Sequence, residues 1–233
     1  MPELKKLIAR LKRHYGEPQL PPAKGPFELV VWENCCYLLP DSRRAAVFAG
    51  LKEQVGMEPR KILAADRGVL LALAKMGGMR PETRVFRWLE IARITIEQFG
   101  GDLDGTVKNV PYANAIKALK QFPNIGGPGA EKILLYCGAG EGLPLDWNGS
   151  RVLLRLGFGR AQAKNYAAQY RSIQEAVAGQ LPKGAAALAQ AHLLLKQHGK
   201  TLCRDKGPDC GECPVVDTCG YGAGHGPAPP GSR

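Results

Sequence analysis

The chain has 233 residues, and its 32 Lys and Arg residues exceed its 21 Asp and Glu residues, which gives a formal net charge of +11. Hydrophobic residues make up 45% and charged residues 23%, and these ordinary globular values exclude wholesale disorder and the collagen-like and fibrous classes. The apolar runs are far shorter than a membrane span and the first residues lack a signal-peptide segment, so we expect a cytoplasmic protein. The excess positive charge favours a polyanionic partner, of which nucleic acid is the commonest.

Almost every segment predicts helix. Residues 3–15 place apolar side chains at helical spacing, and residues 26–39 begin with proline at a first-turn position and end before the next proline. Further helical candidates, in chain order, are residues 42–55, 58–65, 67–76, 81–99, 109–121, 128–137, 148–156, 162–180 and 184–198. No run alternates apolar and polar residues between hairpin turns, so the predicted fold class is all-α. Residues 220–233 are rich in Gly and Pro and are expected to form a disordered tail.

Four of the seven cysteines lie near the end of the chain, with six, two and five residues between them: Cys203, Cys210, Cys213 and Cys219. In a reducing compartment they are not read as a disulfide framework. Thiolates so close in sequence can wrap one metal centre, and soft thiolates select zinc or an iron–sulfur cluster. Structural zinc usually takes two tight cysteine pairs and only one is present, so an iron–sulfur cluster is preferred, with zinc or free thiols as the alternatives.

A glycine-rich turn joins two predicted helices at residues 122–130. Glycine allows backbone angles at which N–H groups converge, and the next helix begins there with the positive end of its dipole, so a phosphate could dock. Turns of this kind also serve helix packing alone, and that alternative stays open. The candidate DNA-contacting residues of the turn are Asn124, Ile125, Gly126, Gly127 and Gly129.

Asp146 lies sixteen residues beyond the turn, at the start of another predicted helix. An Asp at this place commonly caps the helix that follows. The motif that begins with it also contains Asn148 and Arg151.

The glycine-rich turn, Asp146, residues 191–203 and the 6-2-5 cysteine spacing together resemble the endonuclease III superfamily of helix-hairpin-helix (HhH-GPD) DNA glycosylases, in the family's order and over about residues 1–220. The resemblance implies a two-lobed all-α fold that binds double-stranded DNA with a damaged or mismatched base in the cleft between the lobes. It implies a helix-hairpin-helix lobe at residues 22–137, a cluster lobe at 1–21 plus 138–219, and a 4Fe–4S cluster on the four cysteines. It also implies a monomer, associated with the nucleoid if the source is bacterial.

Pro128 separates two branches of that family. Bifunctional members, which also nick the backbone, carry a lysine nucleophile at the matching position, and proline has no amine for a Schiff base. Lys132 lies four residues further on, about 6 Å along a helix, and is an alternative nucleophile, although a salt-bridging role is preferred. The sequence therefore predicts a monofunctional glycosylase of base excision repair without AP lyase activity.

The acidic residues resemble those of the adenine-mismatch glycosylases. Their Asp-Gly-Asn-Val-x-Arg-Val pattern is similar to residues 146–152, in which Trp147 replaces the glycine. Aligning the Pro-Phe pair at residues 26–27 with that branch brings Glu33 onto its catalytic glutamate. An exposed or first-turn glutamate is the alternative interpretation.

The chemistry gives these residues roles. Breaking an N-glycosidic bond leaves positive charge on the sugar and electrons on the departing base. Asp146 would stabilise the sugar cation and help to orient water, Glu33 would protonate the base, and Asn148 would position Asp146 or the water. A purine gains most from ring protonation, so a damaged or mispaired purine is preferred. A pyrimidine glycosylase acting on uracil or thymine mismatches, and a non-catalytic iron–sulfur DNA-binding protein, are the alternatives.

Four more residues are candidates for DNA contact. Tyr37 and Met79 could fill the space that an extruded base leaves, or they could be packing residues. Lys200 and Arg204 flank the first cysteine and could meet the phosphate backbone, or serve solubility alone. We expect the chain to lack the additional C-terminal domain with which the adenine-mismatch branch reads oxidised guanine. Pro128 and the Cys36-Tyr37 pair also replace residues of that branch, so its substrate is not transferred to this chain.

Overall fold

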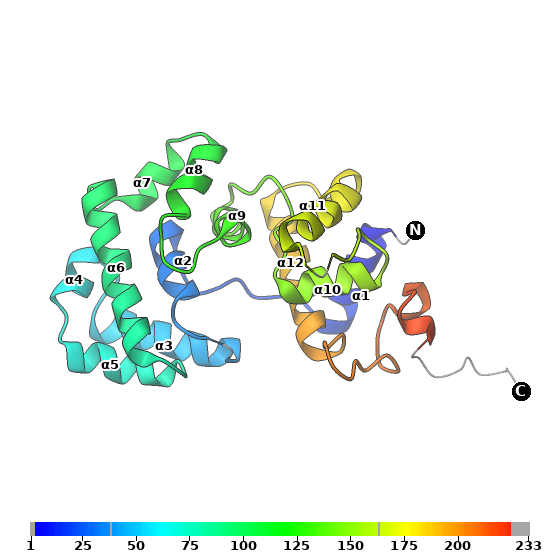
Figure 1. Ribbon diagram of the computed structural model, residues 1–233, viewed down its shortest axis with the longest axis horizontal. Helices are drawn as coiled ribbons and strands as arrows, with labels where there is room; N and C mark the ends of the chain where they lie inside the picture. The colour runs from blue at the N-terminus through cyan, green and yellow to red at the C-terminus, as the bar shows by residue number, and fades with distance from the viewer. Residues whose placement is uncertain (1–2, 38, 163, 225–233) are drawn as a thin grey trace, which may run out of the picture. The chain divides into compact units, whose positions relative to one another are not determined.

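A computed structural model of the chain describes residues 3–37, 39–162 and 164–224 (Figure 1). It confirms the all-α class, because the described residues form helices and turns and no strand. The chain divides into two compact units. The central unit is Pro21–Ala139, and the terminal unit combines Met1–Leu20 with Gly140–Arg233. Within the described ranges, none of the helices has both the length and the hydropathy that crossing a bilayer would take.

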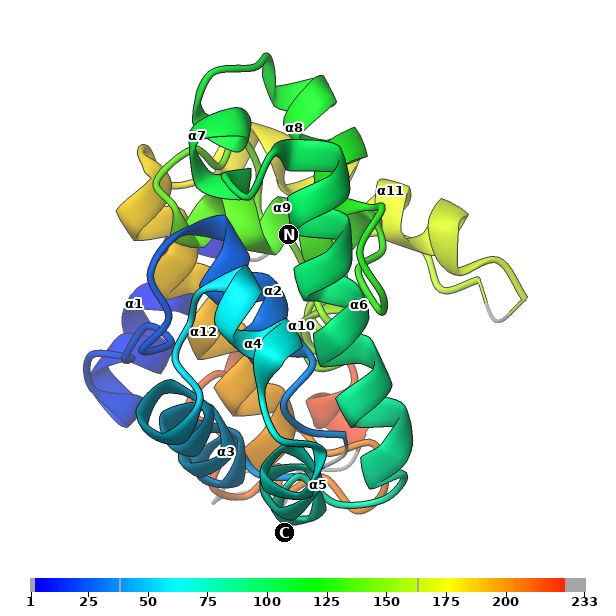
Figure 2. The same cartoon turned by 90° about the vertical axis from the view of Figure 1, so that its left-hand side faces the viewer.

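The central unit is built around one apolar helix, α2. Nearly every residue of this helix between Pro26 and Trp32 is buried, and α2 packs against α3, α6, α7 and α9. Figure 2 shows the long helix α6 running through the unit from the α5 end to the α7 end. The helices of the unit are α2 (Gly25–Glu33), α3 (Asp41–Gln54), α4 (Pro59–Ala64), α5 (Arg67–Met76), α6 (Pro81–Phe99), α7 (Leu103–Lys108), α8 (Tyr112–Leu119) and α9 (Gly127–Tyr136).

Helix α2 ends six residues earlier than the sequence predicts. Asn34 leaves the helical conformation, with φ −97° and ψ 4°, and is only 3% exposed. Its side-chain Nδ2 donates to Val30 O and to Pro123 O, each at 3.0 Å, so the helix end is fixed to the start of the glycine-rich turn. Glu33 is therefore the last residue of α2.

Helix α7 is missing from the sequence prediction. Asp102 caps it by accepting a hydrogen bond from Gly105 N at 2.7 Å. The capping aspartate was a usable signal. With only six residues, however, the helix shows little periodicity, and its stability depends on packing against α2 and α8.

The terminal unit is organised around α12, which packs against α1 and α10. Gly199 allows the close approach of α12 to α10, since a Cβ there would lie 2.7 Å from both the Cβ and the carbonyl oxygen of Asn148. Its helices are α1 (Leu4–Tyr15), α10 (Trp147–Arg155), α11 (Tyr166–Val177) and α12 (Ala185–Thr201), with short 3-10 turns at Ala178–Gln180, Val216–Thr218 and Gly222–Gly224.

Of the tail expected over residues 220–233, residues 225–233 lie outside the described residues. Residues 220–224 pack on the unit. Arg155 lies over the ring of Tyr221, with 4.2 Å from the guanidinium carbon to the ring centre, and a 3-10 turn follows at Gly222–Gly224.

Candidate active site and DNA-binding residues

Asp146 is the N-cap of α10. Its Oδ1 accepts a hydrogen bond from Gly149 N at 2.8 Å, and the side chain is half-buried. Capping thus uses one carboxylate oxygen and leaves the second for other contacts. The next residue, Trp147, is 59% exposed and stacks on Tyr166 of α11, with ring centres 6.4 Å apart.

A chain of polar contacts runs from Asp146 into the unit. Asn148 Nδ2 lies 3.4 Å from Asp146 Oδ2, and Asn148 Oδ1 accepts from an Arg151 NH2 group at 2.9 Å. The same guanidinium donates to Gly199 O at 2.7 Å and to Cys203 O at 3.0 Å. Arg151 therefore fixes the orientation of Asn148 and connects the acidic residue to the first cysteine of the C-terminal set.

Glu33 lies in the central unit, within a small group of charges. Its Oε2 accepts from Lys132 Nζ at 2.8 Å and is 3.8 Å from an Arg44 NH1 group. All three side chains are less than 20% exposed. Two neighbouring cations favour the ionised carboxylate in the free protein. The pair joins residues 99 positions apart in the chain, on α2 and α9.

The glycine-rich turn leads directly into α9. Gly126 is the N-cap, Pro128 lies in the first turn, and Asn124 adopts φ +63° and is exposed. A Cβ added at Gly126 or Gly127 would meet no atom within 4 Å, so the turn offers open space before the helix. By contrast, Ile125 is 5% exposed and its N–H donates to Phe122 O at 3.2 Å, which fits a packing role for this side chain.

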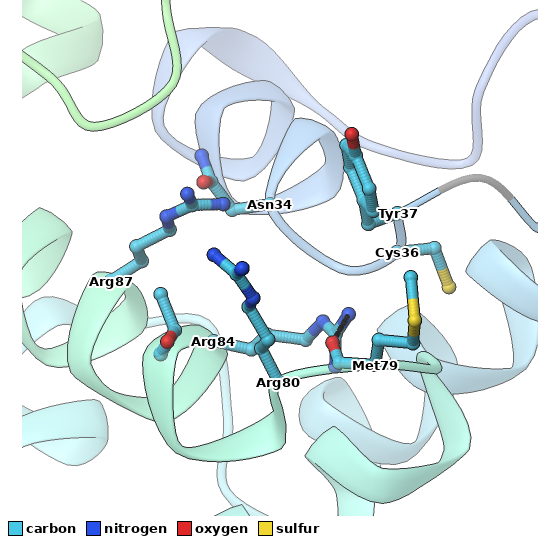
Figure 3. A pocket seen from close by; sticks show the side chains of 8 residues that line it. Asn34, Cys36, Tyr37, Met79, Arg80, Arg84 and Arg87 are labelled. Atoms are coloured by element: carbon cyan, nitrogen blue, oxygen red, sulfur yellow. Dashed lines mark hydrogen bonds between the residues drawn. The ribbon is translucent and has the colours of Figure 1, made fainter.

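Tyr37 and Met79 line one hollow of about 430 Å³ in the central unit. They are 56% and 67% exposed. Figure 3 shows Tyr37, Cys36 and Met79 along one side of the hollow, with Arg87 reaching toward Asn34 on the other. The remaining lining residues are Arg80, Thr83 and Arg84.

Three arginines that the sequence pattern did not single out also line this hollow. Arg84 and Arg87 follow an i, i+3 spacing, which places them on one face at the start of α6, and Arg80 immediately precedes this helix. That spacing was a usable signal, but it indicates a basic helix face and does not say which arginine is buried.

The four C-terminal cysteines, Cys203, Cys210, Cys213 and Cys219, line one small pocket of the terminal unit. Burial, with a smaller contribution from the other three sulfurs, raises the pKa of Cys213 to about 11, so the thiols are close enough to interact. In the part of the chain that the structure describes, no three His, Cys, Asp or Glu side chains are already arranged to hold a metal ion. The four thiols are therefore suitable ligands for a thiolate-bound metal, although the described side chains are not yet in a coordinating arrangement.

Lys200 and Arg204 are both exposed beside this pocket. The Arg204 guanidinium donates to Thr201 O and to Gly207 O, each at 2.8 Å, so it also holds the loop that follows the first cysteine.

Two of three comparisons with known proteins find similar proteins. No protein-family model matches the chain. The chain is 26% identical over 216 residues to a provisionally named DNA repair glycosylase of Methanocaldococcus jannaschii, covering 92% of this chain and 94% of that protein. It is 26% identical over 182 residues to the endonuclease III of Sulfolobus acidocaldarius, covering 78% and 75%. A solved endonuclease III, trapped as a covalent intermediate with DNA, superposes with a TM-score of 0.74 at 16% identity, over 97% of this chain and 99% of that one.

Proposed function

The chain belongs to the endonuclease III superfamily of helix-hairpin-helix DNA glycosylases, and we propose that it is a monofunctional enzyme that hydrolyses the N-glycosidic bond of a damaged or mispaired base, preferably a purine. One observation carries the proposal. Asp146 is held by Gly149 N through one carboxylate oxygen and approached by Asn148 at the other. A fixed, half-buried carboxylate of this kind is what a cationic sugar requires.

In this mechanism Asp146 stabilises the positive charge that develops on the sugar and orients the attacking water. Asn148 keeps Oδ2 of Asp146 in place and is itself held by Arg151. As the C–N bond breaks, its electrons pass to the departing base, and protonation of a ring nitrogen lowers the energy of that base. The water proton is lost to Asp146 or to solvent once the C–O bond forms.

Glu33 is proposed as the group that protonates the base. Its ion pair with Lys132 favours the ionised form in the free protein, so the proton must arrive when the substrate is bound. We propose that Glu33 takes this proton from solvent as the base enters, that the exclusion of water then favours the neutral acid, and that Lys132 keeps its charge. Active-site hydrogen bonds commonly rearrange between the free and the substrate-bound protein.

The absence of an amine at Pro128 supports a monofunctional enzyme, and so does the state of Lys132. A lysine attacks the sugar only as a neutral amine, whereas Lys132 is ion-paired with Glu33. We expect the protein to release free base and leave an abasic site that only added alkali cleaves, with no DNA crosslink under borohydride. Lys132→Met and, as its control, the exposed Lys120→Met should both remain free of crosslink. A crosslink lost only in Lys132→Met would assign lyase chemistry to that lysine.

Substrate choice is tested by a panel of duplexes containing uracil, thymine mismatches, hypoxanthine, alkylated purines and adenine opposite oxidised guanine. We expect release of purines to dominate. Release of uracil or thymine alone would support the pyrimidine alternative. If no base is released from any duplex of the panel, the result would support a DNA-binding protein without catalysis. Under each alternative, affinity should fall with salt, with a slope of about 0.9 per neutralised phosphate. Because these substrates are DNA, we expect the protein to associate with the nucleoid if its source is bacterial.

The four cysteines are proposed to hold a 4Fe–4S cluster of structural character, because four thiolates saturate the metal ligands and leave the reaction to other residues. We expect brown protein that contains iron and sulfide, and Cys213→Ser should lose most of the iron and unfold at lower temperature. The half-buried Cys137 of the central unit supplies the control, because Cys137→Ser should retain the iron. Colourless protein that contains zinc would contradict the assignment.

A further inference from the structure

Arg84 is a buried cation that is bonded to a loop rather than to an acid. It lies in the first turn of α6 and is 5% exposed. One terminal nitrogen donates to Ala74 O at 2.7 Å and Gly78 O at 3.4 Å, and the other to Gly77 O at 2.7 Å and Met79 O at 3.2 Å. Figure 3 shows the side chain directed at the backbone of Met79. Four carbonyls at the α5–α6 connection thus converge on one guanidinium.

The backbone of this connection, residues 77–80, needs external support. Arg80 adopts φ +57°, a left-handed conformation that is unfavourable for a residue with a side chain, and Gly78 adopts φ +93°. A Cβ at Gly77 would lie 2.9 Å from the Arg84 guanidinium and 2.3 Å from Cys35 O. The guanidinium therefore packs directly against the backbone of Gly77, where no side chain intervenes. We infer that its hydrogen bonds hold the conformation of the 77–80 loop.

Stability alone is a poor explanation for this arginine. Burial lowers the pKa of Arg84, which reflects the cost of holding a cation away from water, and its hydrogen-bond partners are uncharged carbonyls. The guanidinium does, however, supply several donors in one fixed plane, which suits it to fixing a loop.

The loop that Arg84 fixes carries one of the two side chains that are candidates for entering DNA, and it contacts the segment that carries the other. Met79 extends from the loop and is 67% exposed. Tyr37, 56% exposed, belongs to a different segment, and its N–H lies 3.5 Å from Gly77 O, one of the carbonyls that Arg84 holds. One buried side chain thereby connects both residues at the rim of the same hollow.

We propose that Arg84 is a positioning residue for base extrusion, which holds the 77–80 loop so that Met79 and Tyr37 replace the departing base in the stack. The inference rests on the proposed function, because only an enzyme that extrudes a base from DNA leaves a space for these two exposed side chains to fill. Arg84 itself is buried and acts through Met79. Extrusion breaks stacking and pairing, so a filler held in place in advance lowers its cost.

Extrusion can be measured without base release, using a duplex with 2-aminopurine at the target position and recording the fluorescence rise at saturating protein. We expect a severalfold smaller rise with Arg84→Met, an intermediate rise with Arg84→Lys, and a small rise with Met79→Ala. Arg93→Met is the matched control on α6, because Arg93 pairs on the surface with Glu90 and Glu97 and its loss should leave the signal unchanged.

A double-mutant comparison shows whether Arg84 acts through Met79. In the Met79→Ala background the Arg84→Lys change should add little, because both changes remove the same filler. A second duplex, with 2-aminopurine opposite an abasic analogue, should restore most of the signal to the Arg84 variants, since no pair must be broken. A general folding defect would not be rescued in this way. If Arg84→Met does not fold, the comparison of Arg84→Lys, Met79→Ala and their double mutant still tests the inference.

An unchanged fluorescence rise in folded Arg84→Met, or equal losses on both duplexes, would overturn the inference. Fully additive effects of Arg84→Lys and Met79→Ala would also overturn it. Base release from the substrate panel is scored separately. Wild-type protein that extrudes 2-aminopurine but releases no base would refute the proposed catalysis and leave the role of Arg84 supported.

Discussion

Replacing Asp146 by asparagine should slow single-turnover base release by roughly a hundredfold to a thousandfold, because the change removes the negative charge opposite the developing sugar cation. The fold should be spared, since asparagine caps helices as well as aspartate does and retains an oxygen for Gly149 N. Affinity for a duplex containing an abasic analogue should therefore be nearly unchanged. The measurements are single-turnover base release at saturating enzyme and the Kd for the analogue duplex.

The Asp66→Asn variant provides the matched control. Asp66 caps α5 by accepting from Val69 N at 3.0 Å, so the control makes the same chemical change at another helix start. It should leave base release intact. In Asp146→Ala the loss of the cap should also cost about 1 kcal/mol of unfolding free energy, as measured in urea. Base release by Asp146→Asn at the wild-type rate would remove this residue from the mechanism.

Replacing Glu33 by glutamine should slow release of an unmodified purine by roughly a hundredfold to ten-thousandfold, the range expected for a lost general acid. Glutamine occupies nearly the same volume and can still contact Lys132, but it cannot transfer a proton. Glu28→Gln is the matched control, because Glu28 lies on the same helix, is also 15% exposed and is paired with Lys52 at 2.9 Å. We expect base release by the control to match that of the wild type.

The leaving group separates proton donation from a purely structural role of Glu33. A 7-methylguanine already carries positive charge and leaves without protonation, so Glu33→Gln should slow its release far less than that of hypoxanthine. Equal losses on both bases would show that Glu33 orients its neighbours rather than donating a proton. Unfolding in urea should be followed in parallel, because the change leaves Lys132 and Arg44 without their carboxylate.

The sequence by itself determined the features that depend on residue type and local order. Helical periodicity with proline and glycine at helix ends is a local property, and it predicted the all-α class and the identical bounds of α5 and α6. Pro128 excludes an amine at its position whatever the fold is. The spacing of the four cysteines allows one shared centre, and the structure places them around one pocket.

Tertiary structure alone decided which distant groups meet. The ion pair of Glu33 with Lys132 and the bond from Asn34 to Pro123 O join segments about ninety or more positions apart, and no periodicity specifies such partners. For the same reason the end of α2 was misplaced, because its local apolar pattern continues while the contact with the turn ends the helix. Arg84 shows the limit most clearly. Spacing assigns it to a basic face, whereas packing buries it and directs its donors to a loop.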